Sequence, residues 1–317
     1  MKKNILKRII ATMLITATAV SMTGCSFPGN ILGKKEKTES KVKNEKLVDD
    51  EYVDLSIESM KVDADDCSYT YSCKTKKDGQ SIILDMYVIA VNGVMVKDEE
   101  RMPIGQVFDD WDGKKKTETV DFSSVNDALS KLDENKITVV DFYYDYTVYE
   151  DSEIINEAEG TKSIYPYGEK EAHYYKPDEN NGKVIFDNDG VKVIFLGADF
   201  SDDGLNFNMN YYIENKGDIE QISFASATTF YDQKMYVNGE EYTTEMGSDG
   251  ITFVDKGYCG LWSVSFDTLD SVFDDIESVD DIDTIEVGIA LYDTDNFGKD
   301  NRDKFIFDDM VFLDSLR

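Results

Sequence analysis

Residues 205–211 read LNFNMNY, so apolar and polar side chains alternate without a break. Successive side chains of a β-strand point to opposite faces of its sheet, and this period of two therefore predicts a strand with one buried and one wet face. The same alternation returns in residues 285–291, which read IEVGIAL, and in residues 305–307. The chain is therefore predicted to be all-β, with mainly antiparallel strands.

Two Asn-Gly pairs, Asn92-Gly93 and Asn238-Gly239, predict tight hairpins. Both residue types tolerate the positive φ angles that the central positions of a type I′ turn require. One short stretch in each half of the chain changes to helical spacing and predicts a short helix that crosses between two sheets. In the first half this stretch runs from Ser123 or Ser124 to about Leu132; in the second it contains Phe266, Leu269, Val272, Phe273 and Ile276, after Asp267 or Thr268 as N-cap.

The chain also contains a weak internal repeat. Its four matches keep their order while the offset between them drifts, as small insertions in the loops of duplicated domains would produce. We therefore predict two copies of one β unit. The matched positions are Val53–Ile57 with Val191–Phe195, and Tyr69, Tyr71 and Cys73 with Phe207, Met209 and Tyr211, at an offset of 138; Val91–Gly93 with Val237–Gly239 at 146; Phe122, Val125, Leu129 and Leu132 with Phe266, Leu269, Phe273 and Ile276 at 144; and Phe142, Tyr144, Tyr146 and Val148 with Ile285, Val287, Ile289 and Leu291 at 143.

The first 25 residues have the pattern of an export signal. A basic start precedes a mostly apolar stretch at residues 9–20, which is too short for a membrane-spanning helix of about 20 residues. Residues 22–25, Met-Thr-Gly-Cys, resemble the lipobox of bacterial lipoproteins. That resemblance implies that residues 1–24 are a cleaved signal peptide. It also implies that the Cys25 thiol carries a lipid and anchors the protein to the cell membrane, facing the extracellular side.

Charge separates the mature chain into a tether and a body. Asp and Glu number 65 against 33 Lys and Arg, so the formal net charge is −32. Residues 1–24 carry four bases and no acid, and residues 26–46 carry six Lys and three Glu, which leaves −32 − 4 − 3 = −39 for residues 47–317. Residues 25–46 have few large apolar side chains and are predicted to form a disordered basic tether. The acidic body excludes nucleic-acid binding, which needs a basic surface.

The whole plan is similar to a group of poorly characterised Gram-positive surface lipoproteins with repeated immunoglobulin-like domains. The lipobox, the Lys/Ser/Glu-rich tether, Asp187–Val193 and Val237–Gly239 carry this similarity. It implies two tandem immunoglobulin-like β-sandwiches at residues 47–168 and 183–317, joined by a linker at residues 169–182. The family supplies no active site, so the resemblance implies a fold and a location only.

No catalytic constellation is present in the sequence, and we expect neither a cofactor nor a metal. The single His173 falls in the linker without a nucleophile motif, and we interpret it as a solvated side chain. Cys67 and Cys73 would lie about 20 Å apart on one strand, beyond the reach of a disulfide. We expect no essential disulfide for them or for Cys259.

Two alternatives to a binding protein stay open. Asp293–Asp303 and Asp199–Asn210 begin like calcium loops with oxygen ligands, which would make the protein a calcium-binding structural module. Asp, Asn and Gly also simply favour turns between strands. A pair of carboxylates could instead serve an enzyme that acts on cell-wall glycans.

An aromatic strand supplies the candidate recognition patch. In residues 142–149, which read FYYDYTVY, one parity faces the core and the other points Tyr143, Asp145 and Tyr149 outward. Tyrosine combines apolar area with a polar tip, so this patch suits a surface protein or a wall polysaccharide. The competing interpretation is packing against other strands or the second domain. The sequence predicts a lipid-anchored, non-catalytic binding protein and does not name its partner.

Overall fold

The computed structural model describes residues 40–62, 67–96, 106–108, 115–123, 136–177, 182–201, 203–226, 235–242, 246–250, 253–294 and 305–314. Their extended elements are all β-strands, which confirms the all-β prediction, and the helical elements among them are three-residue 3-10 turns. No helix in this part of the chain has the length and apolarity needed to cross a bilayer. The signal peptide, Cys25 and the tether up to residue 39 lie outside the described residues.

The chain forms two compact units, and each is described by itself. The first unit spans Lys37–Pro177 together with Gly257–Leu261, and the second spans Asp178–Lys256 together with Trp262–Arg317.

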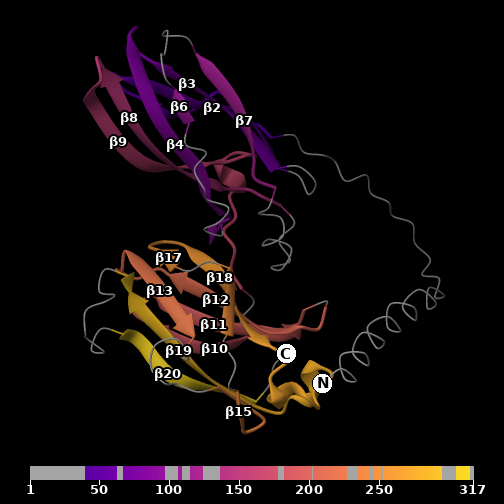
Figure 1. Cartoon of the computed structure of the whole chain (residues 1–317). Coiled ribbons are helices and arrows are strands. Elements are labelled where there is room, and N and C mark those ends of the chain that lie inside the picture. The colour runs from indigo at the N-terminus through magenta and orange to yellow at the C-terminus, as the bar shows by residue number, and fades with distance from the viewer. Residues whose placement is uncertain are drawn as a thin grey trace, which may run out of the picture. The chain divides into compact units, whose positions relative to one another are not determined.

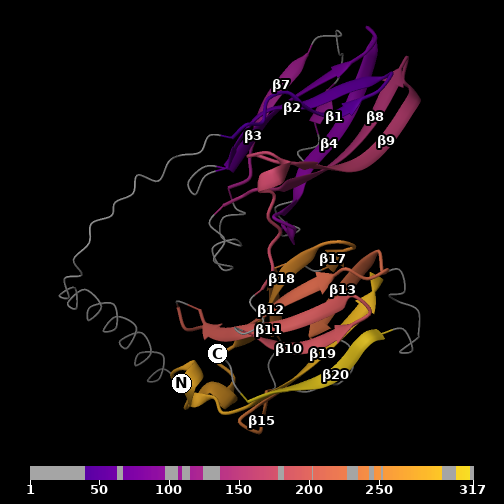
Figure 2. The same cartoon turned by 180° about the vertical axis from the view of Figure 1, so that it is seen from behind.

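The first unit contains two antiparallel sheets (Figures 1 and 2). One has the strand order β1-β2-β3-β7, from β1 (Glu45–Asp49), β2 (Val53–Val62), β3 (Cys67–Thr75) and β7 (Lys116–Asp121). The other has the order β5-β4-β8-β9, with β6 paired to β4, from β4 (Gln80–Val91), β5 (Val94–Met95), β6 (Gln106–Phe108), β8 (Val140–Glu150) and β9 (Glu153–Ile164).

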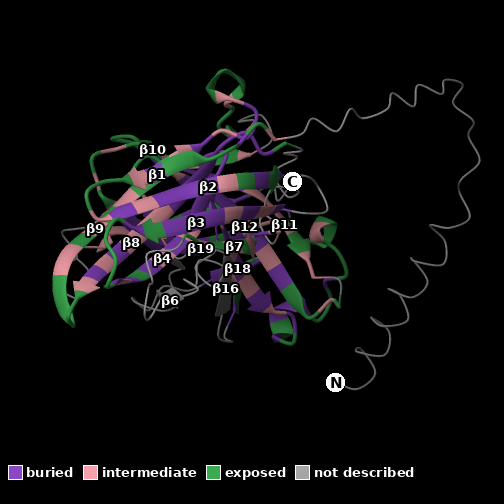
Figure 3. Ribbon diagram, turned by 90° about the horizontal axis from the view of Figure 1, so that it is seen from above, coloured by how far each residue is buried: buried purple, intermediate pink, exposed green. Residues whose placement is uncertain are grey.

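The core of the first unit lies between these two sheets, as in a β-sandwich. Buried residues run along β2 and β3, whereas the edge strand β9 is largely exposed (Figure 3). Tyr69 of β3 meets Phe142 of β8 edge-on, with ring centroids 4.8 Å apart and an interplanar angle of 83°. Both side chains are almost completely buried, so the inward parity of each strand forms one shared core.

The second unit also contains two main sheets. One has the order β10-β11-β12-β18, with β16 paired to β18, from β10 (Lys183–Asn188), β11 (Val191–Phe200), β12 (Asn206–Asn215), β16 (Met246–Gly250) and β18 (Cys259–Asp267), of which the part from Trp262 onward belongs to this unit. The other has the order β15-β14-β19-β13-β17, with β20 paired to β19. Its strands are β13 (Gln221–Ser226), β14 (Met235–Val237), β15 (Glu240–Tyr242), β17 (Phe253–Asp255), β19 (Ile285–Asp293) and β20 (Phe305–Leu313).

The alternating stretch at residues 205–211 forms most of β12. Phe207, Met209 and Tyr211 are completely buried, as the period of two predicts. Tyr211 packs against Trp262 of β18 at 5.2 Å between ring centroids. Leu205 departs from the pattern and is 47% exposed, because it precedes the first residue of the strand.

Both Asn-Gly pairs form the predicted hairpins. Asn92 and Gly93 have φ angles of 50° and 80°, and Asn238 and Gly239 have φ angles of 50° and 83°. The first pair joins β4 to β5 and the second joins β14 to β15, so the chain reverses within two residues each time.

The prediction of a crossover helix at residues 266–276 was wrong. Phe266 is the last inward residue of β18, and Leu269 is 60% exposed. Only the 3-10 turn η5 (Ser271–Phe273) is helical there, and its N-cap is Asp270, whose side chain accepts a hydrogen bond from the Val272 amide. The apolar spacing arose because a strand and a single buried turn lie next to each other. The corresponding stretch of the first half lies outside the described residues from residue 124 to residue 135.

The ends of the first unit differ from the predicted tether and linker. Strand β1 begins at Glu45, and Val42 is already buried, so the tether ends before residue 46. After β9, the chain forms the 3-10 turn η2 (Glu169–Glu171) and then stays with the first unit up to Pro177. The side chain of His173 is exposed, while its backbone amide donates to Thr138 Oγ1 at 2.9 Å.

Candidate functional site

The three predicted recognition residues lie on the outer face of the β4-β8-β9 sheet. Tyr143, Asp145 and Tyr149 share one parity of β8 and are half-buried, whereas Phe142 and Val148 of the other parity are completely buried. The structure therefore places all three on the surface side of one strand. We call this surface, with the neighbouring side chains of β4 and β9 described below, the carboxylate–tyrosine face.

Strand register brings two more carboxylates beside Asp145. Asp85 of β4 pairs with Asp145, and Asp145 pairs with Glu159 of β9, so three acidic side chains form one row across three adjacent strands. Directly opposite residues on one face have Cβ atoms about 5 Å apart, and like charges in that arrangement destabilise a sheet. No lysine or arginine of the described chain forms a salt bridge with any of the three.

A tyrosine pair lies beside this row. Tyr87 of β4 is opposite Tyr143, and their ring centroids are 5.2 Å apart at an interplanar angle of 36°. The Tyr143 hydroxyl donates a hydrogen bond to Glu159 Oε2 at 2.7 Å. Burial, followed by this hydrogen bond to a carboxylate, raises the pKa of Tyr143. The phenol therefore stays protonated and fixes the position of Glu159 as a donor.

The electrostatics of the face are visible at Asp145. Partial burial raises the pKa of this carboxyl above its ordinary value, and the charges of Glu159, Asp85 and Glu157 raise it further. The effect of Glu159 and Asp85 on this pKa is the electrostatic repulsion among the three carboxylates of the row. A cationic group placed over the row would relieve that repulsion, so the arrangement favours a positively charged ligand.

Apolar side chains lie on the other side of the row, opposite the tyrosine pair. Tyr149 is opposite Ser81 on one side and Ile154 on the other. Ile154 is 55% exposed and Ile83 of β4 is 36% exposed. The carboxylate–tyrosine face thus combines a charged centre with aromatic and aliphatic margins, which offer apolar contact area beside the carboxylates.

Sequence reasoning missed Asp85, Tyr87 and Glu159. The parity of β4 alone places Asp85 and Tyr87 on one face, and this signal could have found them. Their position opposite Asp145 and Tyr143 depends on register, which two bulges shift, one between Val88 and Ala90 and one between Val148 and Tyr149.

The calcium hypothesis gains no geometric support from the described residues. They contain no group of three or more His, Cys, Asp or Glu side chains placed to hold a metal ion. Asp203 Oδ1 accepts hydrogen bonds from Ser201 Oγ at 2.6 Å and from the Leu205 amide at 3.0 Å, which is the use of Asp in a turn. Of the predicted loop Asp293–Asp303, residues 295–303 lie outside the described residues.

Three cysteines of the described residues are buried and form no disulfide, namely Cys67, Cys73 and Cys259. Burial raises the pKa of the Cys73 thiol to about 12, so this side chain stays in its unreactive protonated form. None of the three thiols is exposed enough to serve as a nucleophile.

No protein-family model matches the chain, and no curated protein sequence matches it. It is similar to a solved structure, a conserved domain protein from Bacillus anthracis, at 14% sequence identity over 92% of this chain and 94% of that chain, with a TM-score of 0.24. A similarity at this TM-score supports no assignment of fold or function.

Proposed function

We propose that this protein is a lipid-anchored, non-catalytic binding protein of the bacterial cell surface, and that its carboxylate–tyrosine face binds a basic segment of a partner protein. The observation that carries the proposal is the row of Asp85, Asp145 and Glu159, held in register between a tyrosine pair and an apolar margin. An acidic body at −39 repels anionic surfaces and hastens encounter with cationic partners.

The proposal includes two related β-sandwich units, and the positions of the bulges support this relation. Between β1 and β2 the register shifts between Lys46 and Val48, and between β10 and β11 it shifts between Val184 and Phe186, at the offset of 138. Bulges redirect a strand and are retained within a family of folds. Equivalent bulges at equal offsets are therefore the expected mark of duplication.

Register also corrects the internal alignment by two residues. Tyr71 pairs with Ile57, and Tyr211 pairs with Phe195, so Tyr71 corresponds to Tyr211 rather than to Met209. The last pair of these strands is Val62 with Cys67 in the first unit and Phe200 with Phe207 in the second, so the chain has four residues between the paired positions in the first unit and six in the second. An insertion of two residues keeps the alternation intact, which is why the sequence alone did not reveal it.

The strand order refines the immunoglobulin-like part of the proposal. In an immunoglobulin domain one sheet joins the first, second, fifth and fourth strands. Here the first three strands of each unit follow one another in one sheet, as β1-β2-β3 and β10-β11-β12. We therefore use the term only for a sandwich of two antiparallel sheets.

The test of the binding face is a titration of the mature, unlipidated chain with defined peptides. The probes are a short peptide of alternating Arg and Gly and the same peptide with Glu in place of Arg, each at about 50 and about 300 mM salt. We expect the basic peptide to bind and the acidic one not to bind. Asp145→Asn should weaken binding by up to about fivefold, and the double variant with Glu159→Gln by more.

Asp275→Asn is the matched control, because Asp275 is an exposed carboxylate of the second unit. If this control weakens the basic peptide as much as Asp145→Asn does, then binding follows net charge and the proposed face is wrong. Tyr149→Ala should weaken the binding that persists at high salt, since its contribution is apolar.

The anchoring part of the proposal has a separate test. Cys25→Ala should release the protein from the membrane fraction of cells that express the full chain. Retention of that variant in the membrane fraction would refute lipidation at Cys25 as the anchor.

A further inference from the structure

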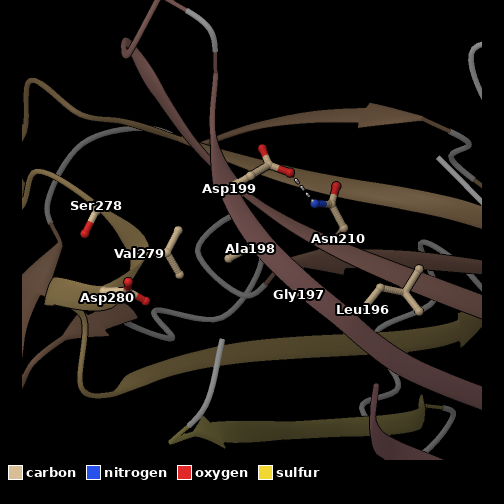
Figure 4. A pocket seen from close by; sticks show the side chains of 8 residues that line it. All are labelled: Leu196, Gly197, Ala198, Asp199, Asn210, Ser278, Val279 and Asp280. Carbon is tan, nitrogen blue, oxygen red and sulfur yellow. Dashed lines mark hydrogen bonds between the residues drawn. The ribbon is translucent and has the colours of Figure 1, made fainter. Parts of the chain in front are cut away.

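A pocket of about 360 Å³ lies in the second unit, beside the second half of β11 (Figure 4). Its floor includes Ala198, Asp199 and Asn210, and its opposite wall is the 3-10 turn η6 (Val279–Asp281) with Ser278 before it. The volume is at the lower end of the range for small-molecule sites, about 300–1,000 Å³. The carboxylate–tyrosine face belongs to the other unit, so the two features are independent.

The pocket exists where the partner strand of β11 ends. Strand β10 pairs with β11 only as far as Phe195, and a bulge follows before Gly197. In the first unit, the corresponding stretch of β2 has neighbours at both ends, because the Asn44 amide donates to the Glu58 carbonyl and the Tyr167 hydroxyl donates to the Val62 carbonyl. These two residues contact the stretch of the first unit that corresponds to the pocket-lining stretch of the second.

A fixed hydrogen-bond network forms the polar side of this pocket. Asp199 Oδ1 accepts from Asn208 Nδ2, and Asp199 Oδ2 accepts from Asn210 Nδ2, both at 3.0 Å. The Asn210 and Asn208 amide oxygens in turn accept from Ser263 Oγ at 3.0 Å and from Ser265 Oγ at 2.8 Å. Each amide is thereby held in one orientation, and ordering these groups costs little when a ligand binds.

The lining selects a class of ligand by its charge and polarity. Asp199 and Asp280 bring negative charge, and the described residues that line the pocket include no Lys or Arg, so an anion is disfavoured. The remaining lone pairs of a carboxylate accept hydrogen bonds from hydroxyl groups, and the second N–H of the Asn210 amide can donate one. Leu196 and Val279 offer aliphatic surface to the carbon skeleton of a ring. A neutral, polyhydroxylated ring satisfies all three conditions.

We propose that this pocket binds a neutral sugar residue of a glycan chain, with Asp199 accepting hydrogen bonds from its hydroxyl groups and Asn210 donating one. Val279 and Leu196 would flank the ring. No covalent step is involved, and the glycan leaves unchanged.

The test is a calorimetric titration of the mature chain with two probes of equal length. One is a neutral tetrasaccharide of β-1,4-linked N-acetylglucosamine, and the other is a tetrasaccharide of a uronic acid. We expect binding of the neutral probe only. Asp199→Asn should weaken that binding by about tenfold or more, because one acceptor carboxylate is lost.

Val279→Phe is the second variant, since it narrows the pocket and leaves the network of Asp199 intact. Val279→Phe should abolish binding of the neutral probe, while Asp275→Asn should leave that binding unchanged. Circular dichroism of each variant checks that it folds. Absence of neutral binding, equal binding of the uronic-acid probe, or binding that survives both pocket variants would overturn the proposal. The response to the Arg-Gly peptide stays intact in every one of these cases if the proposed function is right.

Discussion

The two Asn-Gly hairpins make the same hydrogen bonds in different surroundings, and this difference predicts unequal costs for one substitution. Asn92 Oδ1 accepts from the amides of Thr138 and Val139 at 2.8 and 3.1 Å, and Nδ2 donates to the Lys136 carbonyl at 2.8 Å. Asn238 repeats this arrangement: its Oδ1 accepts from the amides of Asp283 and Thr284 at 2.7 and 3.1 Å, and its Nδ2 donates to the Asp281 carbonyl at 3.0 Å. Asn92 is 0% exposed, whereas Asn238 is exposed.

Asn92→Ala should therefore cost about 4 kcal/mol of unfolding free energy. Three backbone groups lose their partners in a buried place at about 1 kcal/mol each, and Ala at a φ of 50° adds about 1 kcal/mol. Asn238→Ala should cost only about 2 kcal/mol, because water reaches the groups that it leaves unpaired.

The assay is hydrogen exchange by mass spectrometry along a urea series, which follows the opening of each unit by its own peptides. Asn44→Ala is the matched control, since Asn44 also has a φ of 51° and is exposed, and it should cost about 1 kcal/mol. Asn92→Gly removes the same hydrogen bonds without the φ penalty and should lie between Asn44→Ala and Asn92→Ala. Equal costs at Asn92 and Asn238 would refute the reasoning that burial sets the difference.

Three further predictions concern the first unit. Both amide atoms of Gln80 are buried without a partner among the described residues, so Gln80→Met should raise the urea midpoint; a lower midpoint would show that the amide is satisfied in solution. Burial raises the pKa of Asp141 even though Ser163 Oγ donates a hydrogen bond to it at 2.5 Å. The folded pKa of Asp141 therefore exceeds its unfolded pKa, and the carboxylate lowers the stability of the fold as the pH rises above the unfolded pKa. Asp141→Asn should thus stabilise by about 1 kcal/mol at neutral pH and give no gain near pH ~3, and a gain of equal size at both values would contradict this. Partial burial raises the pKa of Asp50, but hydrogen bonds from the Tyr146 hydroxyl and two backbone amides outweigh it and leave the pKa lowered. The stabilisation that the Asp50 carboxylate gains from these hydrogen bonds is present above its unfolded pKa and is lost as the pH falls through its folded pKa. Tyr146→Phe should therefore cost about 1.5–3 kcal/mol of unfolding free energy at neutral pH and less in acid. Calorimetry at both pH values measures this cost, and an equal cost at both would count against the reasoning.

Side-chain period predicted the strands well because one face of each sheet is buried. In β12 the alternation of Phe207, Met209 and Tyr211 with asparagines leaves only one way to place the strand. The predicted helix failed because the same apolar spacing arises where Phe266 ends a strand and Phe273 fills a turn. Periodicity cannot separate these cases over so few residues.

The candidate site was predictable only within one strand. Parity gives Tyr143, Asp145 and Tyr149 a common face, and the structure places them so. The row with Asp85 and Glu159 depends on which residues lie opposite each other. A single bulge shifts that pairing by one residue, and the sequence carries no sharp signal for it.

The buried thiols bear on how long the folded protein lasts. Folded, Cys67, Cys73 and Cys259 are shielded, so the chain reaches its native state without an oxidising enzyme and keeps that state in oxidising or reducing surroundings alike. Unfolded, the same three thiols become accessible and can cross-link to one another or to other chains. Refolding then competes with this cross-linking, and wherever cross-linking is the faster process, the working lifetime follows the unfolding rate rather than the equilibrium stability.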